Sequence, residues 1–374
     1  MLCLSFNAKG KLTKEAFKNY LDSTEYKNLS DTNKAKLTIR GDVQTIGEKA
    51  LSGFSKLEEI KLPSLLQRIC AESFSGCTSL TNITIPDVIE IIGRNVLFRK
   101  TILNGIRLPK SIKMLNNNPF IEHDIKTIII PDNFIEITDG AFSQCSSLTN
   151  IAIPNSVTSI GENAFSECSS LTNITIPNSV TKIDEGAFKF CISLTELNYI
   201  PYISKFTFQG CSSLKNITLS NQVKEIGECA FRGCISLGNL TVPNSVSKIC
   251  SFDFSFCKSI TKIEIPNDVE EIYDGVFYGC SSLTNITIPN RITKIGTYAF
   301  SGCSSLTNIT IPNTVTEINN FCFSECLSLT KITIPNSIVD IGKNASADCS
   351  SFTNITIPNS VTEISDNAFC LFVL

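Results

Sequence analysis

The chain has 374 residues, a formal net charge of −3 and 42% hydrophobic residues. This balance excludes the strongly basic surface that nucleic acids and anionic membranes attract, so we expect neither as a partner. No stretch approaches the ~20 consecutive apolar residues of a membrane-spanning helix, so we predict no transmembrane segment. The opening MLCLSFNAKGK has too short an apolar run for a signal peptide. This favours a cytoplasmic protein or an unconventional route to the cell surface.

Residues 1–33 precede the repeats, and we predict that they form an N-terminal helical cap. Thr13 stands near the expected start of the helix. Apolar residues recur after it at helical spacing, namely Leu12, Ala16, Phe17, Tyr20 and Leu21. A solenoid needs an atypical terminal unit of this kind to cover its first coil.

One 23-residue unit then recurs about fifteen times across residues 34–374. Its clearest copy runs from Leu283 to Ser305 and reads LTNITIPNRITKIGTYAFSGCSS. Positions in each unit are counted from the leading leucine, so Leu283 is position 1. Units this small cannot bury their own apolar face, so they must stack on their neighbours. We therefore predict one solenoid domain over residues 34–374.

Each unit begins with a strand and a turn. Ile286 and Ile288, at positions 4 and 6, alternate with outward polar residues, which is the period of a half-buried strand. Pro289 ends this strand because proline has no N–H for a ladder. The residues PNR then favour a turn.

The rest of the unit predicts a second short strand and a bend. Ile292 and Ile295, at positions 10 and 13, point inward from that strand. We expect one helical or 3₁₀ turn to bury Ala299 and Phe300. Stacked coils give parallel sheets, and parallel crossovers are nearly always right-handed. The predicted fold class is thus a β-rich, right-handed repeat solenoid with short helical or 3₁₀ turns.

The pattern LxxIxIPxxVxxIGxxAFxxC resembles the BspA-like class of leucine-rich repeats over residues 34–374. LTNITIP occurs intact at Leu80, Leu171, Leu283 and Leu306. The resemblance implies a curved leucine-rich repeat solenoid that binds other macromolecules and has no catalytic residues. Many members are surface proteins implicated in adhesion, whereas some intracellular leucine-rich repeat proteins regulate partners such as protein phosphatases.

Positions 3 and 5 of the first strand point outward and carry mostly asparagine and threonine. They form a candidate binding face that includes Asn173, Thr175, Asn216, Thr218, Asn285, Thr287, Asn308 and Thr310. A flat, repetitive polar surface suits multivalent contact with a protein or another extended macromolecule. The same residue types also simply keep a sheet soluble. These asparagines begin Asn-x-Thr acceptor motifs, and glycans on adjacent coils would crowd the face.

Two irregular units are further candidates for specificity. The unit from Leu194 is three residues short and contains Tyr199 and Tyr202. Aromatic residues are enriched at binding hot spots, but they also fill the space that a deletion leaves. The unit from Ile260 is unusually charged, through Lys262, Glu264, Asp268, Glu270 and Glu271. A solvated surface is the alternative interpretation of that patch.

Cysteine and histidine suggest no catalytic or metal chemistry. Eleven of the seventeen cysteines fall at position 21, where we predict buried free thiols that fill a corner of the coil. Stacked neighbours lie within disulfide reach, but the odd total and the lack of an export signal argue against bridges. A linear ladder does not converge on zinc. His123 is the one histidine and lacks a triad partner. We predict no cofactor and no enzyme activity.

The functional hypothesis is a non-enzymatic binding or cell-surface adhesion protein that presents the Asn/Thr face. The alternative is an intracellular interaction scaffold or regulator, for example of a protein phosphatase. Reduced cysteines and the absent export signal favour this alternative. The apolar end of the chain, residues 370–374, either folds over the last coil or permits end-to-end self-association.

Overall fold

In this computed structural model the described residues are 2–24, 34–93, 95–97, 105–109, 114–115, 125–352 and 355–370. They belong to two compact units, Met1–Val180 and Thr181–Leu374. His123 lies outside the described residues. So do residues 371–374, on which the self-association hypothesis depends.

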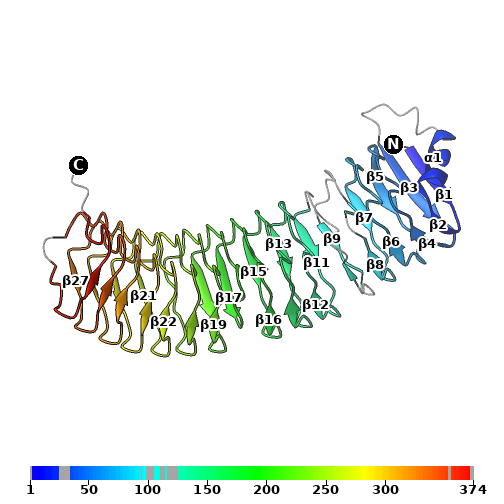
Figure 1. Ribbon diagram of the computed structural model, residues 1–374. Coiled ribbons are helices and arrows are strands. Elements are labelled where there is room, and N and C mark those ends of the chain that lie inside the picture. Colours follow the sequence, from blue (N-terminus) through cyan, green and yellow to red (C-terminus); the bar gives the residue numbers. More distant parts are fainter. Residues whose placement is uncertain are drawn as a thin grey trace. The chain divides into compact units, whose positions relative to one another are not determined.

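In the first unit, strands stack in parallel coil on coil, one stack from the first strand of each coil and one from the second (Figure 1). The first-strand stack contains β1 (Leu2–Asn7), β3 (Ala35–Arg40), β5 (Leu57–Lys61), β7 (Asn82–Thr84), β9 (Gly105–Arg107), β11 (Thr127–Ile129), β13 (Asn150–Ala152) and β15 (Asn173–Thr175). The second-strand stack contains β2 (Gly10–Leu12), β4 (Val43–Ile46), β6 (Arg68–Ile69), β8 (Ile91–Ile92), β10 (Met114–Leu115), β12 (Glu136–Ile137) and β14 (Ser159–Ile160).

The second unit repeats this arrangement with short parallel pairs. Its first strands are β17 (Glu196–Ile200), β18 (Asn216–Leu219), β21 (Lys262–Glu264), β23 (Asn285–Thr287), β25 (Asn308–Thr310) and β27 (Lys331–Thr333). Its second strands are β16 (Lys182–Ile183), β19 (Glu225–Ile226), β20 (Lys248–Ile249), β22 (Glu271–Ile272), β24 (Lys294–Ile295), β26 (Glu317–Ile318), β28 (Asp340–Ile341) and β29 (Glu363–Ile364). The predicted solenoid of parallel stacked strands is confirmed.

The N-terminal segment contains more than the predicted helix. Helix α1 (Lys14–Asp22) begins after Thr13, whose side chain accepts a hydrogen bond from the Ala16 N–H at 3.2 Å. Leu12, however, ends strand β2 rather than joining the helix, and β1 pairs with β3 along its whole length. Sequence periodicity missed both strands because this first coil lacks the repeat motif.

Helix α1 covers the outer edge of the first coil. Phe17 is buried and packs edge-on against Phe6 of β1 and Phe54 of the next coil, at 5.6 and 5.4 Å between ring centroids. The Tyr20 hydroxyl donates to the Ser5 carbonyl at 2.9 Å, on the edge of β1 that has no strand beside it. The helix therefore satisfies an edge that would otherwise pair with another chain.

Equal side chains stack on one another because neighbouring coils are in register. Ile263 faces Ile286 across β21 and β23, and Ile151 faces Ile174 across β13 and β15. The phenylalanines of position 18 form a buried column with ring centroids 5.4–5.8 Å apart in the second unit: Phe188, Phe208, Phe231, Phe254, Phe277, Phe300 and Phe323. The inward positions predicted from the sequence are the core.

The bend around Ala299 and Phe300 is a run of turns, and α1 is the one α-helix among the described residues. Tyr298, at position 16, has a left-handed φ of 58°, which interrupts helical geometry. The Ala299 N–H bonds within the coil, to Gly296 at 3.3 Å, but the Phe300 N–H donates to Cys322 of the next coil at 2.9 Å. This alternation adds a third ladder of hydrogen bonds between coils.

No helix among the described residues is both long and apolar enough to cross a membrane.

Candidate functional site

All eight residues of the predicted Asn/Thr face are exposed on first strands. Parallel register places them in rows: Asn150 faces Asn173 in the first unit, and Thr310 faces Thr333 in the second. Asn216 forms a bridge with Asn239 on the next coil. Position 4 of each strand turns inward, so positions 3 and 5 share one face.

The threonines of this region divide into two groups. At position 2, the hydroxyl donates to a backbone carbonyl of the preceding coil, as in the bonds from Thr284 to Thr261 at 3.2 Å and from Thr330 to Thr307 at 3.1 Å. In the described structure, the position-5 hydroxyls of Thr218, Thr287 and Thr310 form no such bond. Position 2 therefore ties the coils together, and position 5 leaves its donors available. Sequence analysis missed this division because both positions are threonine on an exposed segment.

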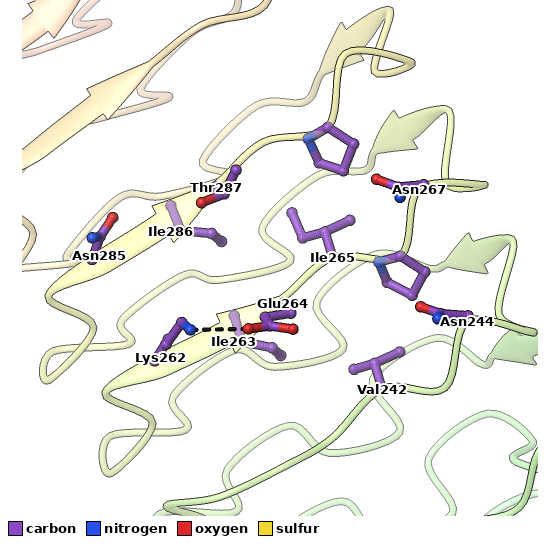
Figure 2. A pocket seen from close by; sticks show the side chains of 12 residues that line it. Val242, Asn244, Lys262, Ile263, Glu264, Ile265, Asn267, Asn285, Ile286 and Thr287 are labelled. Carbon is purple, nitrogen blue, oxygen red and sulfur yellow. Dashed lines mark hydrogen bonds and ion pairs between the residues drawn. The ribbon is translucent and has the colours of Figure 1, made fainter.

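A shallow hollow of about 340 Å³ lies on the same face of the second unit (Figure 2). Ile265 lies near its middle and Val242 at its lower edge in the view, with Asn244 and Asn267 of the turns on one side and Thr287, Lys262 and Glu264 of the strands on the other. A second hollow, of about 630 Å³, has the same construction near Ile334, Asn336 and Pro358. Both hollows use unit positions 3–8, and the second also reaches position 2 at Thr330. At these two places the face forms a shallow trough with apolar and polar walls.

The charged unit from Ile260 does not form one patch. The Lys262 ammonium donates to Glu264 at 2.9 Å, and this bond lowers the pKa of the Glu264 carboxyl. Asp268 and Glu270 both bind Arg291 of the next coil, at 3.3 and 2.8 Å. Glu264, Asp268 and Glu270 are thus each paired with a cation, which favours the interpretation as a solvated surface.

The two tyrosines predicted as a hot spot lie in different kinds of segment. Tyr199 belongs to β17, in the first-strand stack. Tyr202 is 49% exposed, lies outside any strand and directly precedes Ile203, which bridges Ile226 of the second-strand stack. The coil is shortened between Ile200 and Ile203, which pair with Leu219 and Ile226 of the next coil.

The cysteines are all free thiols, and the eleven at position 21 are buried, as predicted. Most of the ladder thiols donate to a carbonyl of the preceding coil; the bonds from Cys280 to Phe254 and from Cys349 to Phe323 are 3.0 Å long. Burial raises the pKa of the Cys280 thiol to about 12. Such a thiol stays protonated at neutral pH and is a poor nucleophile or metal ligand. No cluster of three His, Cys, Asp or Glu side chains suited to a metal occurs in the described parts of the chain.

One buried carboxyl was missed by sequence analysis. Asp253 occupies position 17, where Ala230 and Val276 stand on the adjacent coils, and its side chain is fully buried. One carboxyl oxygen accepts from the Ala230 N–H at 3.1 Å, while the other has no hydrogen-bond partner in the described structure. Burial raises the pKa of Asp253 well above its usual range. The sequence signal that could have identified it is an aspartate at position 17, where the neighbouring coils carry small apolar residues.

The sequence matches a family model along nearly its whole length. The model describes a BspA type leucine-rich repeat region, and it matches residues 4–101, 94–202, 201–303 and 270–372. The chain belongs to the BspA-type leucine-rich repeat family. The resemblance predicted from the repeated LTNITIP motif is confirmed, and membership favours a binding or adhesion role without naming a partner.

Solved structures of bacterial leucine-rich repeat proteins are similar to this BspA-type chain. A leucine-rich repeat protein from Bacteroides ovatus is 22% identical, with 96% of this chain and 91% of that chain covered and a TM-score of 0.57. A leucine-rich cell surface protein from Faecalibacterium prausnitzii is 25% identical, with coverages of 89% and 87% and a TM-score of 0.47. The first of these supports the fold. No curated protein is significantly similar in sequence.

Proposed function

We propose that the chain is a non-enzymatic binding or adhesion protein whose Asn/Thr face contacts an extended macromolecule. One observation carries the proposal: among the residues that the structure describes, the position-5 hydroxyls of Thr218, Thr287 and Thr310 have no hydrogen-bond partner, whereas position-2 hydroxyls such as those of Thr284, Thr307 and Thr330 do. Donors repeated on successive coils give many weak contacts that act together on a repetitive partner. The trough on this face offers apolar contact beside them.

Isosteric threonine substitutions test this proposal. A face variant carries Thr218→Val, Thr287→Val and Thr310→Val, and a control carries Thr284→Val and Thr307→Val at position 2. Labelled wild-type protein is titrated onto intact source cells and detected by flow cytometry. We expect the face variant to bind at least about tenfold more weakly, which corresponds to ~1.4 kcal/mol. The control should lose melting temperature but keep its affinity. Unchanged binding by the folded face variant would contradict the proposal.

A second candidate function is an intracellular scaffold or regulator, for example of a protein phosphatase. The seventeen free thiols favour it, because persistent disulfides are common in proteins exposed to oxidising surroundings. Protease treatment of unpermeabilised source cells separates the two candidates. Loss of the protein would support adhesion at the surface, and full protection would support the scaffold.

A further inference from the structure

A second surface of the second unit, at positions 16–22 of its coils, combines exposed apolar side chains with positive charge. Phe190, Ile192 and Ile235 are 41%, 46% and 45% exposed. Phe190 and Ile192 belong to one coil, and Ile235 belongs to the second coil after it. The Phe190 N–H donates to Gln209 of the intervening coil at 2.7 Å, and the Gly210 N–H of that coil donates to Arg232 at 2.8 Å. We call this surface the turn ridge. Exposed apolar side chains grouped on one surface commonly mark interaction sites.

The turn ridge contains a notch at Gly233. Position 20 reads Phe190, Gly210, Gly233 and Phe256 on four successive coils. The Phe190 ring covers Gly210, where an added Cβ would lie 2.3 Å from the ring. At Gly233 an added Cβ would have no heavy atom nearer than 3.7 Å. An open step therefore remains between the Phe190 ring and the coil of Phe256, and it has room for a small apolar group.

Three cations surround this notch. Lys189 Nζ lies 5.4 Å from the Phe190 ring centroid and 5.3 Å from that of Phe206, and Arg232 lies 5.9 Å from the Phe252 ring. Lys258 is exposed. Among the described residues, no carboxylate lies within ion-pair distance of Lys189, Arg232 or Lys258, although nearby Lys205 pairs with Glu228 at 3.5 Å. The position of Lys189 and Arg232 over aromatic rings sets them apart from other lysines of the unit that lack an acidic partner among the described residues, such as Lys215 and Lys294.

The aromatic residues of the ridge also adopt an unfavourable backbone conformation. Phe190, Phe206, Phe252 and Phe256 have φ between 57° and 60°. This left-handed region suits glycine or asparagine and is strained for bulky side chains. The same conformation recurs at positions 16 and 20 of other coils, as at Lys49, Glu72 and Glu325, so the repeat imposes it and the ridge places aromatic rings on it. Aromatic and arginine side chains together are also the composition of binding hot spots.

We propose that the turn ridge binds an acidic polypeptide segment with one apolar anchor. The carboxylates of the segment pair with Lys189, Arg232 and Lys258, and its anchor enters the notch at Gly233. Charge complementarity selects this partner, because the ridge offers unpaired cations around an apolar step. The surface lies apart from positions 3–8 of the Asn/Thr face, so this inference does not depend on the proposed function.

The probe is a short labelled peptide in which glutamates flank a single phenylalanine, titrated into the full chain by fluorescence anisotropy. A matched peptide with lysines in place of the glutamates and a labelled oligothymidylate are the comparison ligands. We expect saturable binding of the acidic peptide alone. Binding should weaken as salt rises from ~0.1 to ~1 M, because the screening length falls from ~10 to ~3 Å. No saturable binding, or equal binding of the lysine peptide, would overturn the proposal, and tighter binding of oligothymidylate would replace it with a nucleic-acid surface.

Charge variants locate the binding on the ridge. A triple variant with Lys189→Gln, Arg232→Gln and Lys258→Gln should bind the acidic peptide at least about tenfold more weakly. A control loses the same charge elsewhere in the unit, through Lys215→Gln, Lys294→Gln and Lys331→Gln. Equal losses in the two triples would show a general charge effect and overturn the assignment to the ridge.

A glycine substitution tests the notch separately. Gly233→Asn keeps a residue that tolerates left-handed φ, and its side chain fills the open step. The control is Gly53→Asn at position 20 of the first unit, where an added Cβ meets no atom within 4 Å. We expect both variants to melt close to the wild-type temperature. Gly233→Asn should weaken peptide binding, and Gly53→Asn should not. Full affinity in Gly233→Asn would remove the anchor from the proposal.

Discussion

The two units use one repeat to build different outer surfaces. At position 16 both units have left-handed residues, but the first unit carries Lys49 and Asn163 there, whereas the second carries Phe252 and Tyr298. The buried column of position 18 is mostly phenylalanine in both, with Leu51 and Leu97 in the first unit and Ser346 in the second. The difference teaches that the repeat determines the backbone and the core, while the residue type at a strained outer position is free to vary. Surfaces can therefore change along the solenoid without a change of fold.

Removing a buried ring from the position-18 column should lower the free energy of unfolding by a similar amount in the two units. Phe231→Ala in the second unit and Phe165→Ala in the first each remove a buried ring from the position-18 column. We expect each to lower the free energy of unfolding by about 3–5 kcal/mol, from lost burial and the cavity left behind. Denaturant melts measure the loss, and hydrogen exchange should show it first on the neighbouring coils. Unchanged exchange there would contradict the stacked core.

Glycine-to-alanine substitutions at position 16 should lower the free energy of unfolding by different amounts in the two units. Gly140→Ala and Gly275→Ala both place a Cβ at a φ near +60°. At Gly140 nothing lies within 4 Å of the new Cβ, but at Gly275 it would lie 2.2 Å from the Phe252 ring. We expect a loss of about 1–2 kcal/mol from backbone strain in Gly140→Ala. Gly275→Ala should lose about 1–3 kcal/mol more from overpacking. Equal losses in thermal melts would mean that the Phe252 ring moves away without cost.

The buried carboxyl has no equivalent in the column of the first unit, where Ala141 and Ala164 occupy position 17. Asp253→Ala should therefore stabilise the second unit at neutral pH by about 1–3 kcal/mol, because an unsatisfied buried group is removed. The raised pKa means that the folded state holds a proton that the unfolded state loses above pH ~4. Wild-type stability should thus fall relative to Asp253→Ala as pH rises from ~4 to neutrality.

Melting curves of both proteins at several pH values check this, and parallel curves would contradict a protonated Asp253. Asp139→Ala is the surface comparison in the first unit. The Asp139 carboxylate is exposed and accepts a hydrogen bond from the Glu162 N–H at 2.7 Å, unlike the buried Asp253 carboxyl. Its removal should therefore destabilise rather than stabilise, by about 0.5–1.5 kcal/mol.

The smallest expected effect concerns position 12 of the second unit. Glu225 pairs with Lys248 at 2.7 Å, but further along the chain Glu317 faces Asp340 and Asp340 faces Glu363. Asp340→Lys should stabilise by about 0.2–1 kcal/mol, because like charges opposite each other on strands repel. Lys248→Glu should destabilise by a similar amount. Denaturant melts at low and high salt test both, since salt should reduce each difference.

Much of the fold could be predicted from residues at fixed intervals. Ile286, Ile288, Phe300 and Cys303 point inward because their unit positions are apolar in coil after coil. The first coil escaped prediction because β1 and β2 lack that pattern. The sequence predicted a helical bend around Tyr298, and the bend is instead a run of turns. The left-handed φ of Tyr298 and the bond from Phe300 to the next coil depend on contacts between coils, which the sequence of one coil does not reveal.

The candidate surfaces were only partly predictable. The exposure of Asn285 and Thr287 followed from strand alternation, but Thr284 and Thr287 look alike in sequence, and only the structure separates the bonded hydroxyl from the available one. Tyr199 and Tyr202 are close in sequence, yet Tyr199 lies on a strand and Tyr202 lies in the segment between that strand and the bridge at Ile203.

By itself, the sequence determined the repeat, its parallel stacking and its buried rows, since period and residue type repeat along the chain and stacking is the one way to bury them. Only the tertiary structure decided which side chains from different coils meet. The notch at Gly233, the cations around it and the buried Asp253 all arise where residues about one unit apart come into contact. Linear order does not reveal such contacts, because they depend on how each coil settles on the next.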